Sequence, residues 1–276
     1  MAKHWLALVL FGGIAGGVMA TLFGGVVSPR LTEATVRSIV DESLESRAPA
    51  GIAAADLGPA IEKYLLENPS VLEAMSEKLQ ASRAAEQRAE TRAAIADLGP
   101  IIADGEAAVD VGNPSGDVTL VEMYDYNCGY CRNTLPDIAA LLAEDKELRL
   151  VLRQFPILSQ ASLDAAKVGL LVARQGGDYW AFHRAMFTAR GQVTLDTALA
   201  AAETLGLDRD RLEAGLSDQG ISDAIAESFE IAQRLKINGT PSFILADEVI
   251  PGAIGIDALR EKIQNVRTCG STRCSP

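Results

Sequence analysis

The sequence predicts an α/β fold whose strands are interrupted by a long helical insertion and preceded by a helical region. Residues 118–126 alternate in polarity as a strand does, and residues 133–143 follow with helical periodicity. Residues 147–155 alternate again, whereas residues 160–235 are helical in pattern almost throughout. Residues 31–100 contain no strand-like alternation, so we expect a separate helical region ahead of the fold.

Each later element is bounded by its own local signals. Glycines break the insertion, which spans about residues 157–236, into five predicted helices: 162–175, 178–189, 195–205, 208–216 and 222–235. Residues 242–245 and 248–250 then predict a short hairpin, and residues 256–266 a last helix. Strand, helix, strand, insertion, hairpin and helix form a thioredoxin-like order, which we place at residues 106–267.

Size and charge exclude some functions. The chain has 276 residues and is 48% hydrophobic, which is enough for one large domain with an accessory region. Its net charge of −12 argues against nucleic acid as a partner, because nucleic-acid binding needs a basic surface.

The N-terminal residues 1–30 predict a membrane anchor or a signal peptide. Residues 5–27 carry no charge, and this stretch is longer than an ordinary signal-peptide core and close to the roughly 20 residues that span a bilayer. Lys3 before it favours a cytoplasmic N-terminus, although Arg30 beyond it weakens that asymmetry. The length favours an uncleaved anchor over a cleaved signal, and in both cases the remainder of the chain is exported.

Residues 31–105 predict a helical stalk. Apolar residues recur at helical spacing, as in Leu72, Met75 and Leu79, whereas residues 82–92 carry charges around most of the helix. A helix of that kind buries little by itself. It serves either as a solvated connector or as one member of an assembly.

A pair of cysteines at a strand-to-helix junction carries the predicted chemistry. In Cys128-Gly-Tyr-Cys131 the first sulfur lies at a helix N-terminus, where free backbone N–H groups and the helix dipole favour the thiolate. A thiolate attacks disulfides, and a second cysteine at this spacing can resolve the mixed disulfide. We therefore expect thiol–disulfide exchange through a redox-active Cys128–Cys131 disulfide, with no other cofactor and no metal.

The turn before the predicted hairpin adds to this site. Pro241 starts a strand after Gly239 and Thr240, which makes it a candidate for a cis peptide bond. A cis bond turns the Thr240 backbone toward the dithiol, where it can pair with an extended polypeptide. The alternative is a trans proline at a strand edge.

Three polar residues before Cys128, namely Glu122, Asp125 and Asn127, are predicted to contribute to the site. Glu122 shares strand parity with Leu120 and Tyr124, so a buried carboxyl beneath the dithiol is expected to have a raised pKa and to exchange a proton with Cys131. The alternative is a glutamate that faces solvent. Asp125 and Asn127 have the opposite parity and are expected at the rim of the site.

The other histidine and cysteine residues have simpler interpretations. His183 lies in an aromatic helical stretch and is expected to pack in the insertion. No histidine adjoins the motif, which argues against Cys–His hydrolysis. Cys269 and Cys274, in the tail 268–276, predict a local disulfide. A second redox relay, or a soft-metal clip with the motif cysteines, remains as an alternative.

The motif 122–131, the helical insertion and the segment 239–243 together resemble the DsbA-like family of periplasmic thiol–disulfide oxidoreductases over about residues 110–267. The resemblance implies a thioredoxin fold with an inserted helical domain. It also implies that Cys128 is the nucleophile, that Cys131 is the resolving cysteine, that Pro241 is the cis-proline and that Glu122 is the buried acid.

Residues 60–75 resemble the N-terminal stalk of the ScsC branch, whose trimeric members hold three catalytic domains on that segment. Strongly oxidising members have Pro-His between the cysteines and Val before the cis-proline. This chain has Gly-Tyr and Thr240, the combination of the disulfide isomerase DsbC. Without that histidine we expect a less stabilised Cys128 thiolate and a weaker oxidant.

Together these features predict an exported disulfide isomerase or reductase that is oligomeric, as a trimer, through residues 31–100. It would act on cysteine-containing exported proteins and be recycled by a membrane redox partner. We place it on the periplasmic side of the bacterial inner membrane, anchored by residues 5–27, or soluble in the periplasm after cleavage. The alternatives are a monomeric dithiol oxidase with the stalk as a spacer, and a copper- or zinc-binding protein.

Overall fold

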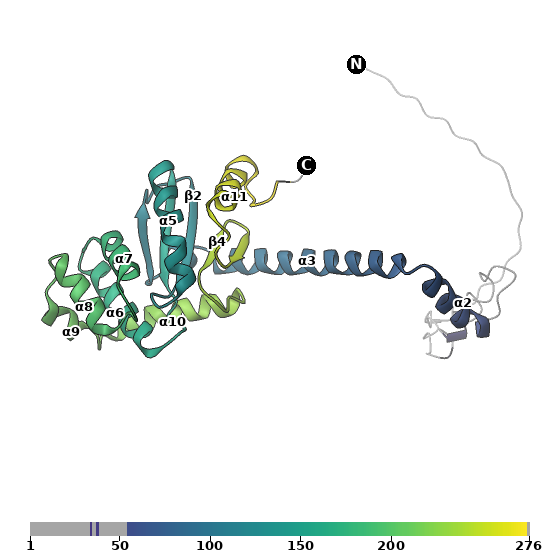
Figure 1. Cartoon of the computed structure of the whole chain (residues 1–276), viewed down its shortest axis with the longest axis horizontal. Helices are drawn as coiled ribbons and strands as arrows, with labels where there is room; N and C mark the ends of the chain where they lie inside the picture. The colour runs from purple at the N-terminus through teal and green to yellow at the C-terminus, as the bar shows by residue number, and fades with distance from the viewer. Residues whose placement is uncertain (1–33, 35–36, 39–53, 275–276) are drawn as a thin grey trace, which may run out of the picture. The chain divides into compact units, whose positions relative to one another are not determined.

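The computed structural model describes residues 34, 37–38 and 54–274 (Figure 1). The described residues fall into two units, with the boundary between Glu73 and Ala74. The predicted anchor or signal at 5–27 lies outside the described residues. Within the described part of the chain, no helix is both long and apolar enough to cross a membrane.

Helices α2 and α3 lie in the described part of the region expected to be helical. Helix α2 spans Ala54–Glu67, and α3 spans Ser70–Leu98 and continues through the charged stretch without a break. Many apolar side chains at the N-terminal end of this region are exposed: Leu57, Ile61, Tyr64, Leu66, Leu72, Met75 and Leu79. The C-terminal end of α3 differs, because Leu98 is buried in a core cluster of the second unit.

The second unit is built on a five-stranded sheet with the order β1-β3-β2-β4-β5. Strand β2 is parallel to β3, and the other pairs are antiparallel. The strands are β1 Ala108–Gly112, β2 Val118–Tyr124, β3 Leu148–Gln154, β4 Ser242–Leu245 and β5 Glu248–Pro251. The predicted strands and hairpin are therefore confirmed, while β1 and the short helix α4 (Ile101–Asp104) were not predicted.

Strand β2 is buried on both faces. Its even-numbered residues Leu120 and Tyr124 join the core cluster that includes Ile138 of α5 (Gly129–Glu144). The odd-numbered Val121 and Met123 join a second cluster with the end of α3 and with α10 (Gln219–Arg234). A central strand of this kind is apolar at most positions, because neither of its faces meets water.

The helical insertion between β3 and β4 forms as predicted and lies beside the sheet (Figure 1). Its helices are α6 Gln160–Arg174, α7 Tyr179–Thr188, α8 Leu195–Thr204, α9 Arg209–Gly215 and α10 Gln219–Arg234. Each one follows a residue whose side chain accepts a hydrogen bond from a backbone N–H of the first turn: Ser159, Asp178, Thr194, Asp208 and Asp218. Polar caps and helical periodicity therefore fix the helix starts locally.

The C-terminal helix α11, Ile256–Cys269, ends at Gly270, and the predicted tail disulfide is present. Cys269 and Cys274 are bonded, with their Cα atoms 5.9 Å apart. Asp247 of the β4–β5 turn holds the loop between them, because its carboxylate accepts hydrogen bonds from the backbone N–H of Thr272 at 2.9 Å and from the Ser271 hydroxyl at 2.7 Å.

Candidate active site

The two motif cysteines lie where β2 passes into α5. Cys128 caps the helix, and its Sγ accepts a hydrogen bond from the backbone N–H of Cys131 at 3.4 Å. Both thiols are free in this structure, and both residues are buried, Cys131 the more completely. The short loop of residues 125–127 connects β2 to α5 and places Cys128 at the start of the helix.

The two thiols have opposite tendencies to ionise. Hydrogen bonding from the Cys131 thiol lowers the pKa of Cys128 to about 5, and hydrogen bonding from the Thr240 side chain and from backbone N–H groups of the first helical turn adds to this effect. Burial raises the pKa of Cys131 far above its usual value, and the neighbouring Cys128 and the charge of Glu122 raise it further. The Cys128 sulfur is therefore ionised and nucleophilic at neutral pH, and the Cys131 thiol stays protonated until a base takes its proton.

The turn before β4 completes the surroundings of Cys128. The Thr240–Pro241 peptide bond is cis, as predicted. In the thiol form, Cys128 Sγ donates to the Thr240 carbonyl oxygen at 3.1 Å. Pairing of β4 with β2 brings these residues together, with Glu122 opposite Phe243. Thr240 and Pro241 thus lie beside the dithiol although a long stretch of chain separates them from it.

Glu122 is buried, with 2% of its surface exposed. Burial raises the pKa of its carboxyl to about 8, while a hydrogen bond from the Thr134 hydroxyl at 3.4 Å opposes this rise and the Cys128 charge adds to it. Thr134 lies one helical turn after Cys131 and also donates to the Cys131 carbonyl oxygen at 2.8 Å. A carboxyl with this pKa is a suitable proton acceptor near neutral pH.

Asp125 and Asn127 do not lie at the rim as predicted. Asp125 is 1% exposed, and its carboxylate accepts hydrogen bonds from the backbone N–H groups of Asn127 at 2.8 Å and Leu158 at 3.0 Å. Asn127 is half-buried and its side chain faces the insertion. The parity argument failed because β2 ends at Tyr124, so the alternation does not continue into the loop.

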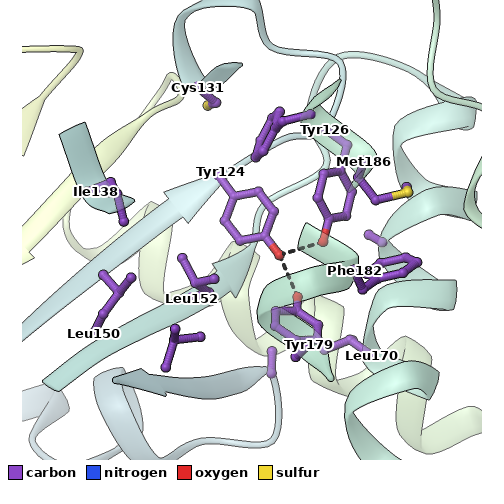
Figure 2. Close-up of a cluster of buried hydrophobic side chains, with 14 of the residues drawn as sticks. Tyr124, Tyr126, Cys131, Ile138, Leu150, Leu152, Leu170, Tyr179, Phe182 and Met186 are labelled. Atoms are coloured by element: carbon purple, nitrogen blue, oxygen red, sulfur yellow. Dashed lines mark hydrogen bonds between the residues drawn. The ribbon is translucent and has the colours of Figure 1, made fainter. Parts of the chain in front are cut away.

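A tyrosine cluster that the sequence did not predict as part of the site joins the end of β2 to the insertion. Figure 2 shows Tyr124, Tyr126 and Tyr179 pointing toward one another. The Tyr124 hydroxyl lies 3.2 Å from that of Tyr126 and 2.5 Å from that of Tyr179, to which Gln154 Nε2 donates at 3.0 Å. The signal in the sequence that could have predicted this cluster is the pair Tyr124 and Tyr126, which lie two residues apart just before Cys128.

His183 packs against the same cluster, as predicted. Its ring meets those of Tyr124, at a centroid distance of 4.7 Å, and Phe187, at 4.9 Å. Burial lowers the pKa of His183 to about 3, so the ring is neutral at physiological pH. Among the described residues, no group of three or more His, Cys, Asp or Glu side chains is placed to hold a metal ion.

A thioredoxin-like sheet with a low-pKa thiolate at a helix N-terminus, a buried second thiol and an adjacent cis-proline turn defines the class of thiol–disulfide oxidoreductases. A family model described as the DSBA-like thioredoxin domain matches residues 119–264. The chain therefore belongs to the DsbA-like family, as its sequence motifs indicated.

Solved structures agree with this assignment. A thioredoxin-like oxidoreductase from Silicibacter pomeroyi DSS-3 is 36% identical, with a TM-score of 0.59 over 62% of this chain and 98% of that one. The thiol–disulfide exchange protein α-DsbA2 from Wolbachia pipientis is 29% identical, with a TM-score of 0.60 over 66% and 98%.

Similarity to the ScsC branch is seen at the level of fold. A linker-deletion mutant of Proteus mirabilis ScsC has a TM-score of 0.60 at 20% identity, covering 80% of this chain and 99% of that one. This coverage is larger than that of the preceding structures.

Among curated proteins, the Na(+)/H(+) antiporter NhaA 1 of Salinispora arenicola (strain CNS-205) is 31% identical over 147 residues, which is 51% of this chain and 22% of that protein. The chain thus spans about a fifth of the length of the curated relatives it matches.

Proposed function

We propose that this protein is a disulfide isomerase or reductase of exported proteins, with Cys128 as the nucleophile. The pairing of a Cys128 thiol of pKa about 5 with a buried, protonated Cys131 supports the exchange chemistry. The observation that carries the choice of isomerase is the Gly-Tyr pair and Thr240 beside the dithiol, together with the exposed apolar residues of α2 and α3. At neutral pH the first sulfur is ionised and attacks, while the second is held back until a mixed disulfide has formed.

The chemical steps balance within this site. The Cys128 thiolate attacks one sulfur of a client disulfide, forming a Cys128–client bond and releasing the other client sulfur as a thiolate, which takes a proton. In the reductase outcome, the ionised fraction of Glu122 accepts the Cys131 proton. That fraction grows once the mixed disulfide has formed, because the Cys128 charge that raises the pKa of Glu122 is then gone. The Cys131 thiolate then attacks Cys128 Sγ. This step releases the client's second sulfur as a thiolate, which takes a proton, and leaves the Cys128–Cys131 disulfide, so two electrons pass to the client. In the isomerase outcome, another client thiol displaces Cys128.

Client recognition is assigned to the surface beside Cys128. Thr240 lies in the turn next to the sulfur, where its backbone pairs with an extended client segment, as in strand addition. Tyr130, between the cysteines, is 70% exposed and offers an aromatic face to an apolar client residue. Gly129, Tyr130 and Thr240 are the residues that favour isomerase over oxidase in the resemblance to DsbC.

The proposed oligomer forms through residues 31–100, and a trimer is our preferred state. The exposed apolar side chains of α2 and the first part of α3 support it, since monomers rarely leave so many large apolar residues uncovered along one segment. Leu72, Met75 and Leu79 recur at helical spacing on α3. Changing Met75 and Leu79 to Lys should leave a monomer in analytical ultracentrifugation, and an unchanged sedimentation coefficient would contradict the proposal.

The proposed location is the periplasmic side of the inner membrane, with residues 5–27 as the anchor and a cleaved signal as the alternative. The Cys269–Cys274 disulfide supports an oxidising compartment. Clients are then cysteine-containing exported proteins, and a membrane redox partner recycles the dithiol. Mass spectrometry of the protein recovered from membrane and soluble fractions decides between anchor and cleaved signal.

A dithiol oxidase is the second candidate, and one observation favours it. A Cys128 pKa of about 5 stabilises the reduced dithiol more than the Gly-Tyr motif led us to expect, and a stabilised reduced form makes a protein a stronger oxidant. The low pKa of Cys128 therefore supports the oxidase. The Gly-Tyr pair, Thr240 and the exposed apolar side chains of α2 and α3 support the isomerase.

Reactivation of a scrambled multi-disulfide substrate in a glutathione buffer separates the two candidates. An isomerase restores activity to the scrambled substrate, and Cys128→Ala abolishes this. An oxidase rapidly oxidises a reduced substrate but does not rescue a scrambled one. Cys131→Ala is the matched control, because it leaves the attacking sulfur in place and prevents resolution. Failure in both assays would contradict the proposal and lead to the metal-binding alternative.

A further inference from the structure

Asn127, the residue directly before the nucleophile, binds the helical insertion with both ends of its amide. Its Oδ1 accepts the backbone N–H of Val193 at 2.8 Å, and its Nδ2 donates to the Val193 carbonyl oxygen at 3.0 Å. Nδ2 also donates to Ser162 Oγ at 3.1 Å. Because Val193 presents one donor and one acceptor, this pattern fixes the orientation of the amide.

The partner of this amide is itself firmly held. Val193 is fully buried and lies in the segment 189–194 between α7 and α8. Ser162 is 1% exposed and belongs to the first turn of α6. Without Asn127, both backbone groups of Val193 would lose their hydrogen-bond partners in a buried place, which the fold avoids. The contact between Asn127 and the insertion is therefore a buried, fully hydrogen-bonded part of the fold.

A second contact connects the other end of the motif to the same segment. Arg132, directly after Cys131, donates from its guanidinium to the Ala189 carbonyl oxygen at 2.9 Å. On the other side, the Asp125 carboxylate holds the Asn127 backbone N–H at 2.8 Å. The residues immediately before and after the dithiol are thus both bonded to segment 189–194 of the insertion.

We propose that Asn127 is a positioning residue through which the helical insertion sets the orientation of the Cys128 thiolate. This inference rests on the proposed function and assigns to the insertion a direct part in the reactivity of the nucleophile.

The physical reason lies in the contacts that stabilise the thiolate. The Cys131 N–H to Cys128 Sγ distance is 3.4 Å, so a small rotation of the loop before Cys128 weakens this bond further. Asn127 adjoins Cys128 in sequence, and loss of its side-chain hydrogen bonds to Val193 and Ser162 frees that loop to rotate. The thiolate then loses part of its stabilisation, and the pKa of Cys128 moves back toward its ordinary value.

Titration of the reduced full-length protein at 240 nm, where thiolate absorbs, tests the inference with Asn127→Ala. A rise of one pH unit in the Cys128 pKa lowers the thiolate fraction at pH 5 about fivefold. We expect a change of that size, with a matching slowing of the reaction with a small disulfide at pH 5. Leu199→Ala is the control, because Leu199 is buried in the insertion and takes no part in the hydrogen bonds that connect the insertion to the motif.

The outcomes separate the two proposals. If Asn127→Ala lowers the melting temperature as Leu199→Ala does but keeps the parent titration curve, the inference is overturned. If the alanine variant does not fold, Asn127→Ser takes its place, because a single short hydroxyl cannot replace both ends of the amide on Val193. An unchanged titration curve for that folded variant overturns the inference equally. If the parent protein itself shows no reactive thiolate, the proposed function fails instead.

Discussion

The buried carboxyl of Glu122 makes the stability of the reduced protein depend on pH, and Glu122→Gln should remove that dependence. The pKa of this group is raised by burial from 4.5 to about 8. Below pH 4.5 the folded and unfolded states both carry the proton, so the carboxyl has no pH-dependent effect. As the pH rises from 4.5 toward 8, the unfolded chain ionises while the folded protein keeps the proton, and folding becomes less favourable.

The size of the effect follows from the two pKa values. Each pH unit between them corresponds to about 1.4 kcal/mol, so the loss reaches up to about 5 kcal/mol at pH 8 and about 3 kcal/mol at pH 7. Water penetration and local relaxation reduce the loss for a real buried group, and we expect about 2–3 kcal/mol at pH 7. Glutamine has no such titration and still accepts a hydrogen bond from Thr134, so the variant should be more stable than the parent by that amount at pH 7.

Urea denaturation of the reduced parent and of Glu122→Gln between pH 5 and 8 measures this difference. Cys128 titrates in both proteins, so its own contribution largely cancels when the two curves are subtracted. The difference should be small at pH 5 and grow steadily toward pH 8. A difference that is constant over this range would refute the buried, proton-holding carboxyl.

Other substitutions test separate parts of the structure. Cys131→Ala should raise the pKa of Cys128 measured at 240 nm, because hydrogen bonding from the Cys131 thiol is the largest contribution to its lowering; an unchanged pKa would contradict this. Tyr179→Phe should reduce the free energy of unfolding by about 1–3 kcal/mol, since it removes a hydroxyl from a buried network. Asp247→Ala should cost a similar amount in thermal denaturation because it leaves the Thr272 N–H without its acceptor; a wild-type melting temperature would show that the tail is held by its disulfide alone.

Local signals made the helical insertion predictable. Each helix there has its own polar cap, as Ser159 has for α6 and Asp178 for α7, and none depends on a distant partner to begin. Strand β1 was missed because only Val111 among its residues is buried, so its alternation is weak. Its position is set by pairing with β3, which a local pattern does not contain.

In the candidate site, too, features set by neighbouring residues were predictable, whereas features set by distant partners were not. Cys128 at a helix N-terminus follows from the strand, the motif and the helix in sequence. The partners of Asn127 do not, because Val193 lies 66 residues away and offers only backbone groups, which carry no side-chain signal. Asp125 was misplaced for a related reason: its carboxylate binds backbone N–H groups, and these are not visible in a pattern of side chains.

The order of strands in the sheet has a consequence for how the protein folds. Strand β2 can pair with β3 as soon as about thirty further residues have been made, but its other neighbour, β4, arrives only after the whole insertion. Closing a loop of 112 residues between Cys128 and Thr240 costs about 4 kcal/mol in chain entropy beyond a constant, so this contact forms late. Until then Cys128 also lacks hydrogen bonding from the Thr240 side chain, which lowers the pKa of its thiol. A newly made chain therefore carries a less acidic thiol at position 128, and its full reactivity appears only when the last strands have docked.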